Sequence, residues 1–167
     1  MKLPAWINTA TAALAAAVLP ACDGFNLQDI RPGITTQAEV RARMGEPSRV
    51  HWNDDGTAVW EYNRQPNGVH CHMIAFNRDN IVASVEQALN EQNYARVRDG
   101  MSKDDVARLL GGPGSKQVFA NLGEEIWEWR IEGLPPLPAE EHYYAVHFSL
   151  ADGGVMRLVM GPEPNKE

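Results

Sequence analysis

The chain has 167 residues, of which 44% are hydrophobic and 22% charged. This is an ordinary composition for a globular protein of one large or two small domains. Its 15 basic and 22 acidic residues give a net charge of −7, which argues against binding to nucleic acid or to an anionic membrane surface, since both need clustered basic residues. With only two cysteines, Cys22 and Cys71, a disulfide framework and a four-cysteine zinc site are excluded.

The first 21 residues have the features of a secretory signal peptide. Lys2 is followed by an uncharged stretch, and residues Ala10–Leu19 are mostly Ala, Leu and Val, which is typical of the apolar region of such peptides. A membrane span needs about 20 apolar residues, whereas here polar residues interrupt the stretch between Pro4 and Pro20. We therefore predict that residues 1–21 are removed on export.

The residues at the end of this stretch, Leu19-Pro20-Ala21-Cys22, resemble the bacterial lipobox. The resemblance implies that Cys22 becomes an acylated N-terminus, and two or more acyl chains hold a protein stably on a membrane. Residues 22–26 would then form a lipid-anchored linker. In the alternative, the protein is secreted in soluble form and Cys22 has no such role.

Two parts of the remaining chain carry the same short motifs in the same order, which indicates an internal duplication. In the first part the motifs are Gly33, Glu39-Val40, Met44-Gly45, Pro47, Trp60-Glu61-Tyr62 and Met73–Phe76. In the second part they are Gly100, Asp105-Val106, Leu110-Gly111, Pro113, Trp127-Glu128-Trp129 and Ala145–Phe148. We therefore divide the mature chain into repeats at 27–89 and 90–160, and expect a disordered tail at 161–167.

Each part is predicted to begin with a short helix that has clear start and stop signals. Thr36 and Ser102 are good N-caps, and the acidic residue three positions after each completes a capping box. Gly45 and Gly111 end the two helices. A weaker helical signal covers Asn90–Val97. The apolar face that we expect to be buried in the second capped helix consists of Val106, Leu109 and Leu110.

Alternating apolar and polar residues bounded by turn residues predict four strands in each part. In the first part they are Arg49–Trp52, Ala58–Tyr62, Val69–Phe76 and Ile81–Leu89. In the second part they are Lys116–Phe119, Glu125–Arg130, His142–Leu150 and Val155–Met160. The predicted fold is therefore α+β, with two tandem repeats that each pack a short helical part on an antiparallel β-meander.

The motif order Gly–apolar–Ser/Thr, acidic–Val and apolar–Gly–x–Pro, followed by an aromatic pair, resembles the SmpA/OmlA domain of the BamE-like outer-membrane lipoproteins. The resemblance covers about residues 27–160 as two copies, whereas the best-known members carry one. It implies a fold like one repeat of the β-lactamase inhibitory protein. It also implies a non-catalytic module that binds envelope proteins, such as the β-barrel assembly machinery, and acts in outer-membrane protein assembly or envelope integrity.

Two alternatives stay open at this point. The resemblance implies a lipid-anchored location on the outer membrane, facing the periplasm. Asp23 directly after Cys22 instead resembles the enterobacterial signal for retention in the inner membrane. As to function, the likeness to an inhibitory fold suggests an inhibitor-like binder of a periplasmic enzyme as the alternative to an assembly role.

The aromatic residues are the main candidates for partner contact. Trp60 and Tyr62 share one strand face, as do Trp127 and Trp129, and Trp52 lies on the preceding strand. Aromatic pairs at matching positions are suited to a protein-binding surface. The interpretation that we favour is that they pack the sheets on the helices, because each repeat otherwise has few large residues to bury. Because Trp52 has no aromatic counterpart in the second part, we predict that it is exposed while Trp60 and Trp127 are buried.

Other motifs have simpler explanations. His70 and His72 share a strand face and Cys71 points away from it, so they supply at most half of a zinc site, and no metal or other cofactor is expected. Residues 111–116 resemble a phosphate loop but follow a helix instead of a strand. No catalytic motif occurs, and we expect no enzyme activity. The proline-rich residues 134–138 are expected to form a semi-rigid loop that either docks on a partner or stays solvated.

Overall fold

The computed structural model describes residues 27–132 and 142–162. The predicted signal peptide, the linker at 22–26 with Cys22, and the proline-rich residues 134–138 therefore lie outside the described residues. In the part of the chain that is described, no helix is long and apolar enough to cross a membrane.

The described chain consists of two halves, each with short helices followed by four strands. The first half contains η1 (Leu27–Asp29), α1 (Gln37–Met44), β1 (Arg49–Trp52), β2 (Ala58–Asn63), β3 (Cys71–Phe76) and β4 (Val82–Gln87). The second contains α2 (Glu91–Tyr94), α3 (Lys103–Leu110), β5 (Ser115–Phe119), β6 (Glu124–Ile131), β7 (His142–Ser149) and β8 (Val155–Pro162). Each set of strands forms its own antiparallel sheet, in the orders β1-β2-β3-β4 and β5-β6-β7-β8.

Both longer helices begin and end as their sequences predict. Thr36 caps α1 and Ser102 caps α3, each in a complete capping box with the acidic residue three positions later. Both helices end at a glycine with φ +79°, Gly45 in the first half and Gly111 in the second. Residues other than glycine rarely adopt the backbone conformation found at these two positions.

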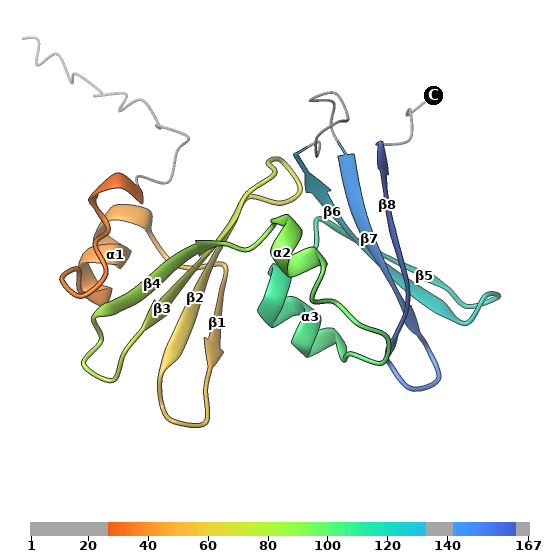
Figure 1. Ribbon diagram of the computed structural model, residues 1–167, viewed down its shortest axis with the longest axis horizontal. Helices are drawn as coiled ribbons and strands as arrows, with labels where there is room; N and C mark the ends of the chain where they lie inside the picture. The colour runs from red at the N-terminus through yellow and green to blue at the C-terminus, as the bar shows by residue number, and fades with distance from the viewer. Residues whose placement is uncertain (1–26, 133–141, 163–167) are drawn as a thin grey trace, which may run out of the picture.

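The elements form alternating layers (Figure 1). Helix α1 covers one face of sheet β1–β4, α2 and α3 lie between the two sheets, and sheet β5–β8 forms the far layer. One core cluster lies between α1 and the first sheet and includes Val40, Trp60 and Ile74. A second, larger cluster joins the other face of that sheet to α3 and the second sheet, through residues such as Cys71 and Leu110.

The structure confirms the predicted α+β class and two antiparallel sheets, with corrections at element ends. Gly161 and Pro162 are not part of a tail, because they pair with Tyr143 and His142 in the β7–β8 ladder. The helix predicted over Asn90–Val97 is shorter and ends at Tyr94, where Ala95 is the C-cap.

The predicted apolar face of α3 is buried in part. Val106 and Leu110 have no exposed surface. Leu109, the third residue predicted for this face, is half-buried at its margin. Helix α3 also buries Ala107, because it packs on a sheet at each side.

Candidate functional site

Four of the five aromatic residues considered for partner contact are core residues. Trp60, Tyr62, Trp127 and Trp129 are all buried, and the side chain of Trp129 has no exposed surface. The two rings of each pair contact each other at a tilt, and the first ring of each pair, Trp60 or Trp127, also contacts the phenylalanine of the neighbouring strand. The prediction that these four residues contact a partner is therefore wrong for the folded chain, because other residues of the chain already cover their side chains. Trp52 is 64% exposed, as predicted from its lack of a counterpart.

The second aromatic residue of each pair has a further structural role that the sequence did not indicate. The Tyr62 hydroxyl donates to the carbonyl oxygen of Gly45 at 3.0 Å. The Trp129 indole N–H donates to the carbonyl oxygen of Gly111 at 3.1 Å. Each side chain thus hydrogen-bonds the glycine that ends the helix of its own half, which fixes the helix on the sheet.

The His70, Cys71 and His72 cluster does not form a site. The two imidazole rings stack at 5.9 Å on one side of β3, and His70 pairs with Glu132 at 3.3 Å. Cys71 is fully buried beneath α3, and burial raises the pKa of its thiol, to which the nearby carboxylate of Glu61 adds. Among residues 27–132 and 142–162, no group of three His, Cys, Asp or Glu side chains could hold a metal ion.

A buried polar cluster joins the two halves at Glu61. One carboxylate oxygen of Glu61 accepts hydrogen bonds from the Gly112 N–H at 2.8 Å and from Asn63 at 3.0 Å. The other lies 3.0 Å from Nε2 of the buried His51. Burial by itself raises the pKa of Glu61, but the hydrogen bonds from His51, Gly112 and Asn63 outweigh it and hold the pKa below its usual value. Glu61 and His51 are both buried, so we assign the cluster a structural role.

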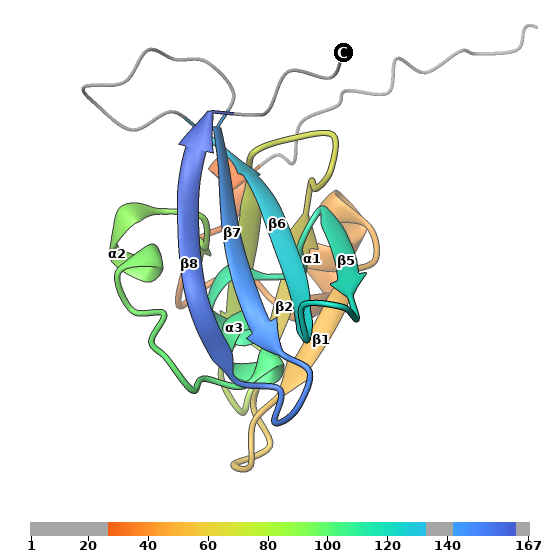
Figure 2. The same cartoon turned by 90° about the vertical axis from the view of Figure 1, so that its right-hand side faces the viewer.

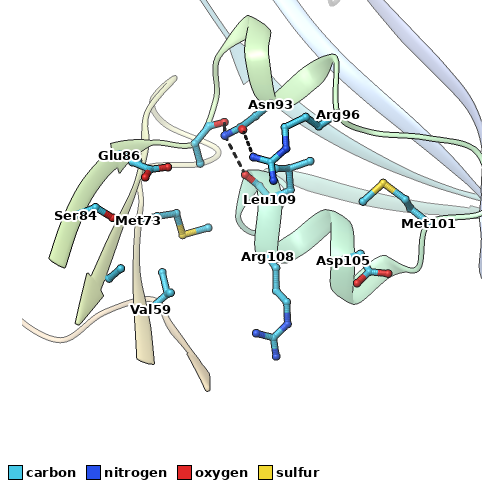
Figure 3. A pocket seen from close by; sticks show the side chains of 12 residues that line it. Val59, Met73, Ser84, Glu86, Asn93, Arg96, Met101, Asp105, Arg108 and Leu109 are labelled. Atoms are coloured by element: carbon cyan, nitrogen blue, oxygen red, sulfur yellow. Dashed lines mark hydrogen bonds between the residues drawn. The ribbon is translucent and has the colours of Figure 1, made fainter. Parts of the chain in front are cut away.

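A groove of about 450 Å3 lies beside α3, on the part of sheet β1–β4 that this helix leaves uncovered (Figure 3). Met73 and Leu109 line its apolar floor, and Arg96 and Arg108 stand at its rim. The Arg96 guanidinium donates to the Asn93 side chain at 3.0 Å. The remaining charged residues of the lining, Glu86 and Asp105, balance the two arginines. The charges that line the groove therefore favour neither anionic nor cationic ligands.

The outer face of the second sheet, turned away from α3, has no described helix over it (Figure 2). Gln117, Ile126, His147 and Arg157 pair in turn from strand to strand across this face. His147 Nδ1 lies 2.8 Å from Glu124 Oε2, and Arg157 donates to the same oxygen at 3.4 Å. The hydrogen bond from His147, with help from Arg157, holds the pKa of Glu124 below its usual value.

Large apolar side chains that are well exposed concentrate on this second sheet. Of the eight in the described residues, two, Ile34 and Trp52, lie in the first half. The six others belong to the second sheet and its turns: Val118, Leu122, Leu150, Met156, Leu158 and Met160. Three of the six, Met156, Leu158 and Met160, follow one another on β8. Exposed apolar side chains that gather on one surface often mark an interaction site. The second sheet is therefore the candidate interaction site.

The described residues define an α+β protein with two antiparallel sheets, little helix and a buried polar junction. No protein-family model matches the chain, and no curated protein matches it.

Solved structures with a similar arrangement include a proposed β-lactamase inhibitor protein from Streptococcus mutans, at 11% identity and a TM-score of 0.31, covering 76% of this chain and 82% of that chain. A DUF4309 family protein from Bacillus subtilis is 12% identical with a TM-score of 0.30, covering 81% and 84%. An extracellular protein with an SCP domain from Bacillus anthracis is 12% identical with a TM-score of 0.30, covering 99% of this chain and 56% of that chain. At these scores the matches carry no inference about what this chain does.

Proposed function

We propose that this chain is a lipid-anchored envelope protein that binds another protein and catalyses no reaction, with a role in outer-membrane β-barrel assembly or envelope integrity. The observation that carries the binding role is the run of exposed apolar side chains on β8, namely Met156, Leu158 and Met160. Clusters of this kind are typical of protein-protein interaction sites. The buried Cys71 thiol and the enclosed Glu61 cluster offer no accessible reactive group.

The envelope location rests on the N-terminal sequence. Residues 1–21 have the features of a signal peptide, and Leu19-Pro20-Ala21-Cys22 resembles a lipobox. The assembly role rests on the likeness of the two motif sets to the SmpA/OmlA domain, which we propose as a tandem duplication. Equivalent capping boxes, helix-ending glycines and buried aromatic pairs in the two halves support the duplication.

Acylation of Cys22 is tested by labelling cells with radioactive palmitate. We expect label in the wild-type protein and none in Cys22→Ser, which should move from the membrane fraction to the soluble periplasm. Equal labelling of both forms would contradict acylation at Cys22. Density-gradient separation of the two membranes then decides between the outer membrane and the retention that Asp23 suggests.

The partner is tested by photo-crosslinking in the native host. A photoreactive amino acid replaces Met156 on the second sheet, and a matched chain carries it at Ala42, which is exposed on α1. We expect a light-dependent crosslink from position 156 to a subunit of the β-barrel assembly machinery, and none from position 42. A crosslink from position 156 to a soluble periplasmic enzyme would support the inhibitor-like alternative. Equal or absent crosslinking from both positions would contradict the binding role.

A further inference from the structure

The edge of the second sheet at β8 carries exposed apolar side chains, and the register shift of the β7–β8 ladder falls at the first of them, Met156. Strand β8 is an edge strand of eight residues, because β7 is its one neighbour in the sheet. Met156, Leu158 and Met160 occupy alternate positions and are 50%, 37% and 40% exposed. Leu158 pairs with Val146 and Met160 with Tyr144, so both lie on the face turned toward α2 and α3. An edge with exposed apolar side chains is a template for an additional strand.

The chain itself already adds backbone to the beginning of this edge. The Gly100 N–H donates to the Val155 carbonyl oxygen at 2.8 Å, and the Val155 N–H donates to the Met101 carbonyl oxygen at 3.0 Å. This cover ends where Ser102 begins the cap of α3. Among the described residues, no backbone hydrogen bond from outside the sheet continues this cover along the rest of β8. The unpaired part of the edge is therefore continuous with an edge contact that the fold makes.

The other sheet shows the same contact, but its edge is better covered. At the beginning of β4, Gly33 and Thr35 bond to Val82 as Gly100 and Met101 bond to Val155. Val85, further along β4, packs against the first core together with Leu27 of η1. The corresponding side chains of β8 stay exposed. The two edges thus differ in side-chain exposure, since β8 exposes apolar side chains along its edge and Val85 of β4 packs against a core.

Helix α2 lies behind the edge of the sheet, where an added strand would pack. Tyr94 of α2 stacks on Tyr144 with ring centroids 4.7 Å apart, which places α2 behind β7. In Figure 2, α2 extends past the β8 edge of the sheet. A strand added to β8 would therefore have its inward side chains beside Leu158 and Met160 and facing α2. A second copy of this chain fits less well, because two-fold pairing of the β8 edges would bring two α2 helices into one layer.

We propose that β8 binds an extended segment of another polypeptide by strand addition, with apolar side chains at alternate positions of that segment. The proposal rests on the binding role proposed above and names its surface and the class of partner. Main-chain hydrogen bonds along β8 supply the affinity, and the inward apolar positions supply the specificity. Arg157 is the one charged residue of β8, and Glu124 already pairs with it at 3.4 Å, so the alternating apolar side chains define the segment.

The test uses the full chain carrying Cys22→Ser and fluorescein-labelled peptides of nine residues. The probe peptide alternates valine with threonine and glutamate. A second peptide has the same composition with its valines in one block, and a third has the alternating sequence with N-methylated amides. We expect fluorescence anisotropy to show binding of the alternating peptide. The dissociation constants of the other two peptides should be at least about tenfold larger. Hydrogen exchange of the Leu158 and Met160 amides should slow in the complex, because alternate residues of β8 direct their N–H groups away from β7.

The matched variants are Leu158→Lys, on the edge, and Leu122→Lys, an exposed apolar residue in the β5–β6 turn. We expect Leu158→Lys to weaken binding about tenfold or more and Leu122→Lys to leave it within about twofold. Circular dichroism checks that both variants fold. Equal binding of the three peptides, or no slowing of exchange in β8, would overturn strand addition.

Two further outcomes are also decisive. A dimer in light scattering without peptide, dissociated by Leu158→Lys, would make a second copy the occupant and overturn the proposal. If the crosslink from position 156 persists in Leu158→Lys while no peptide binds, strand addition fails and the proposed function stands. If the crosslink is absent but the alternating peptide binds, the edge proposal stands and the proposed role in β-barrel assembly fails.

Discussion

The junction between the two halves predicts that two glycines with the same backbone conformation tolerate alanine very differently. Gly45 and Gly111 both have φ +79° and both end a helix. A side chain added at Gly45 meets nothing within 4 Å. A side chain added at Gly111 overlaps the Sγ atom of Cys71 and lies 3.3 Å from Glu61 Oε1, because α3 packs closely on the first sheet.

The expected magnitudes follow from these two effects. Backbone strain in a region reserved for glycine costs about 1–3 kcal/mol, and both Gly45→Ala and Gly111→Ala incur it. Overpacking of a well-packed core adds about 1–3 kcal/mol, and only Gly111→Ala incurs that cost. The difference between the two variants in the free energy of unfolding should therefore be about 1–3 kcal/mol.

Urea unfolding followed by circular dichroism measures this difference, in the full chain carrying Cys22→Ser. Replacing Cys71 with alanine removes the overlapping sulfur atom, so Cys71→Ala should offset part of the cost of Gly111→Ala and none of the cost of Gly45→Ala. The coupling energy between positions 111 and 71 should be at least about 1 kcal/mol. Equal costs for the two glycine variants, with no coupling to Cys71, would refute the close packing of α3 on the first sheet.

Three other predictions concern stability. Glu61→Gln should lower the free energy of unfolding by about 1.5–3 kcal/mol at pH 7. Because the pKa of Glu61 is lowered in the folded chain, the wild type should lose this advantage as the pH falls below the ordinary glutamate pKa of about 4.3. A difference that stays constant between pH 7 and pH 3 would contradict it. Trp129→Ala should cost about 3–5 kcal/mol, whereas the exposed Trp52→Ala should cost less than about 0.5 kcal/mol, as calorimetric unfolding would show. Leu110→Ala should cost about 2–5 kcal/mol and the half-buried Leu109→Ala about half as much; similar costs in urea unfolding would argue against the groove beside α3.

Local signals predicted the elements well, because those signals act within a few residues. Thr36 and Ser102 cap their helices through bonds to residues three positions away, so the sequence alone contains both partners. The strand over Arg49–Trp52 was predicted with its exact bounds for a similar reason, since the turns around it are short. Trp52 was predicted to be exposed by comparing the two motif sets.

The junction was not predicted, because its partners are far apart in the sequence. Glu61 lies between two aromatic residues, and Glu128 has the same place in the second half. Glu61 is buried against Gly112, whereas Glu128 is half-buried and pairs with Ser115. The alternation that puts Trp60 and Tyr62 in one core turns Glu61 to the opposite face. A glutamate between two core aromatic residues could have indicated that the opposite face of the sheet is also covered. It could not have indicated that α3 covers it.

The order of the layers also makes the two ends of the molecule different. Helix α3 is apolar on two sides, burying Val106 and Ala107, and is therefore suited to lie between two sheets. In α1 the residue after Val40 is Arg41, whose guanidinium lies 4.8 Å from the Trp60 ring, and α1 buries Val40 alone. The α1 end is thus a solvated cap of the kind that closes stacked structures. The two ends of the layer order therefore differ, since a helix forms one end and the sheet β5–β8 forms the other.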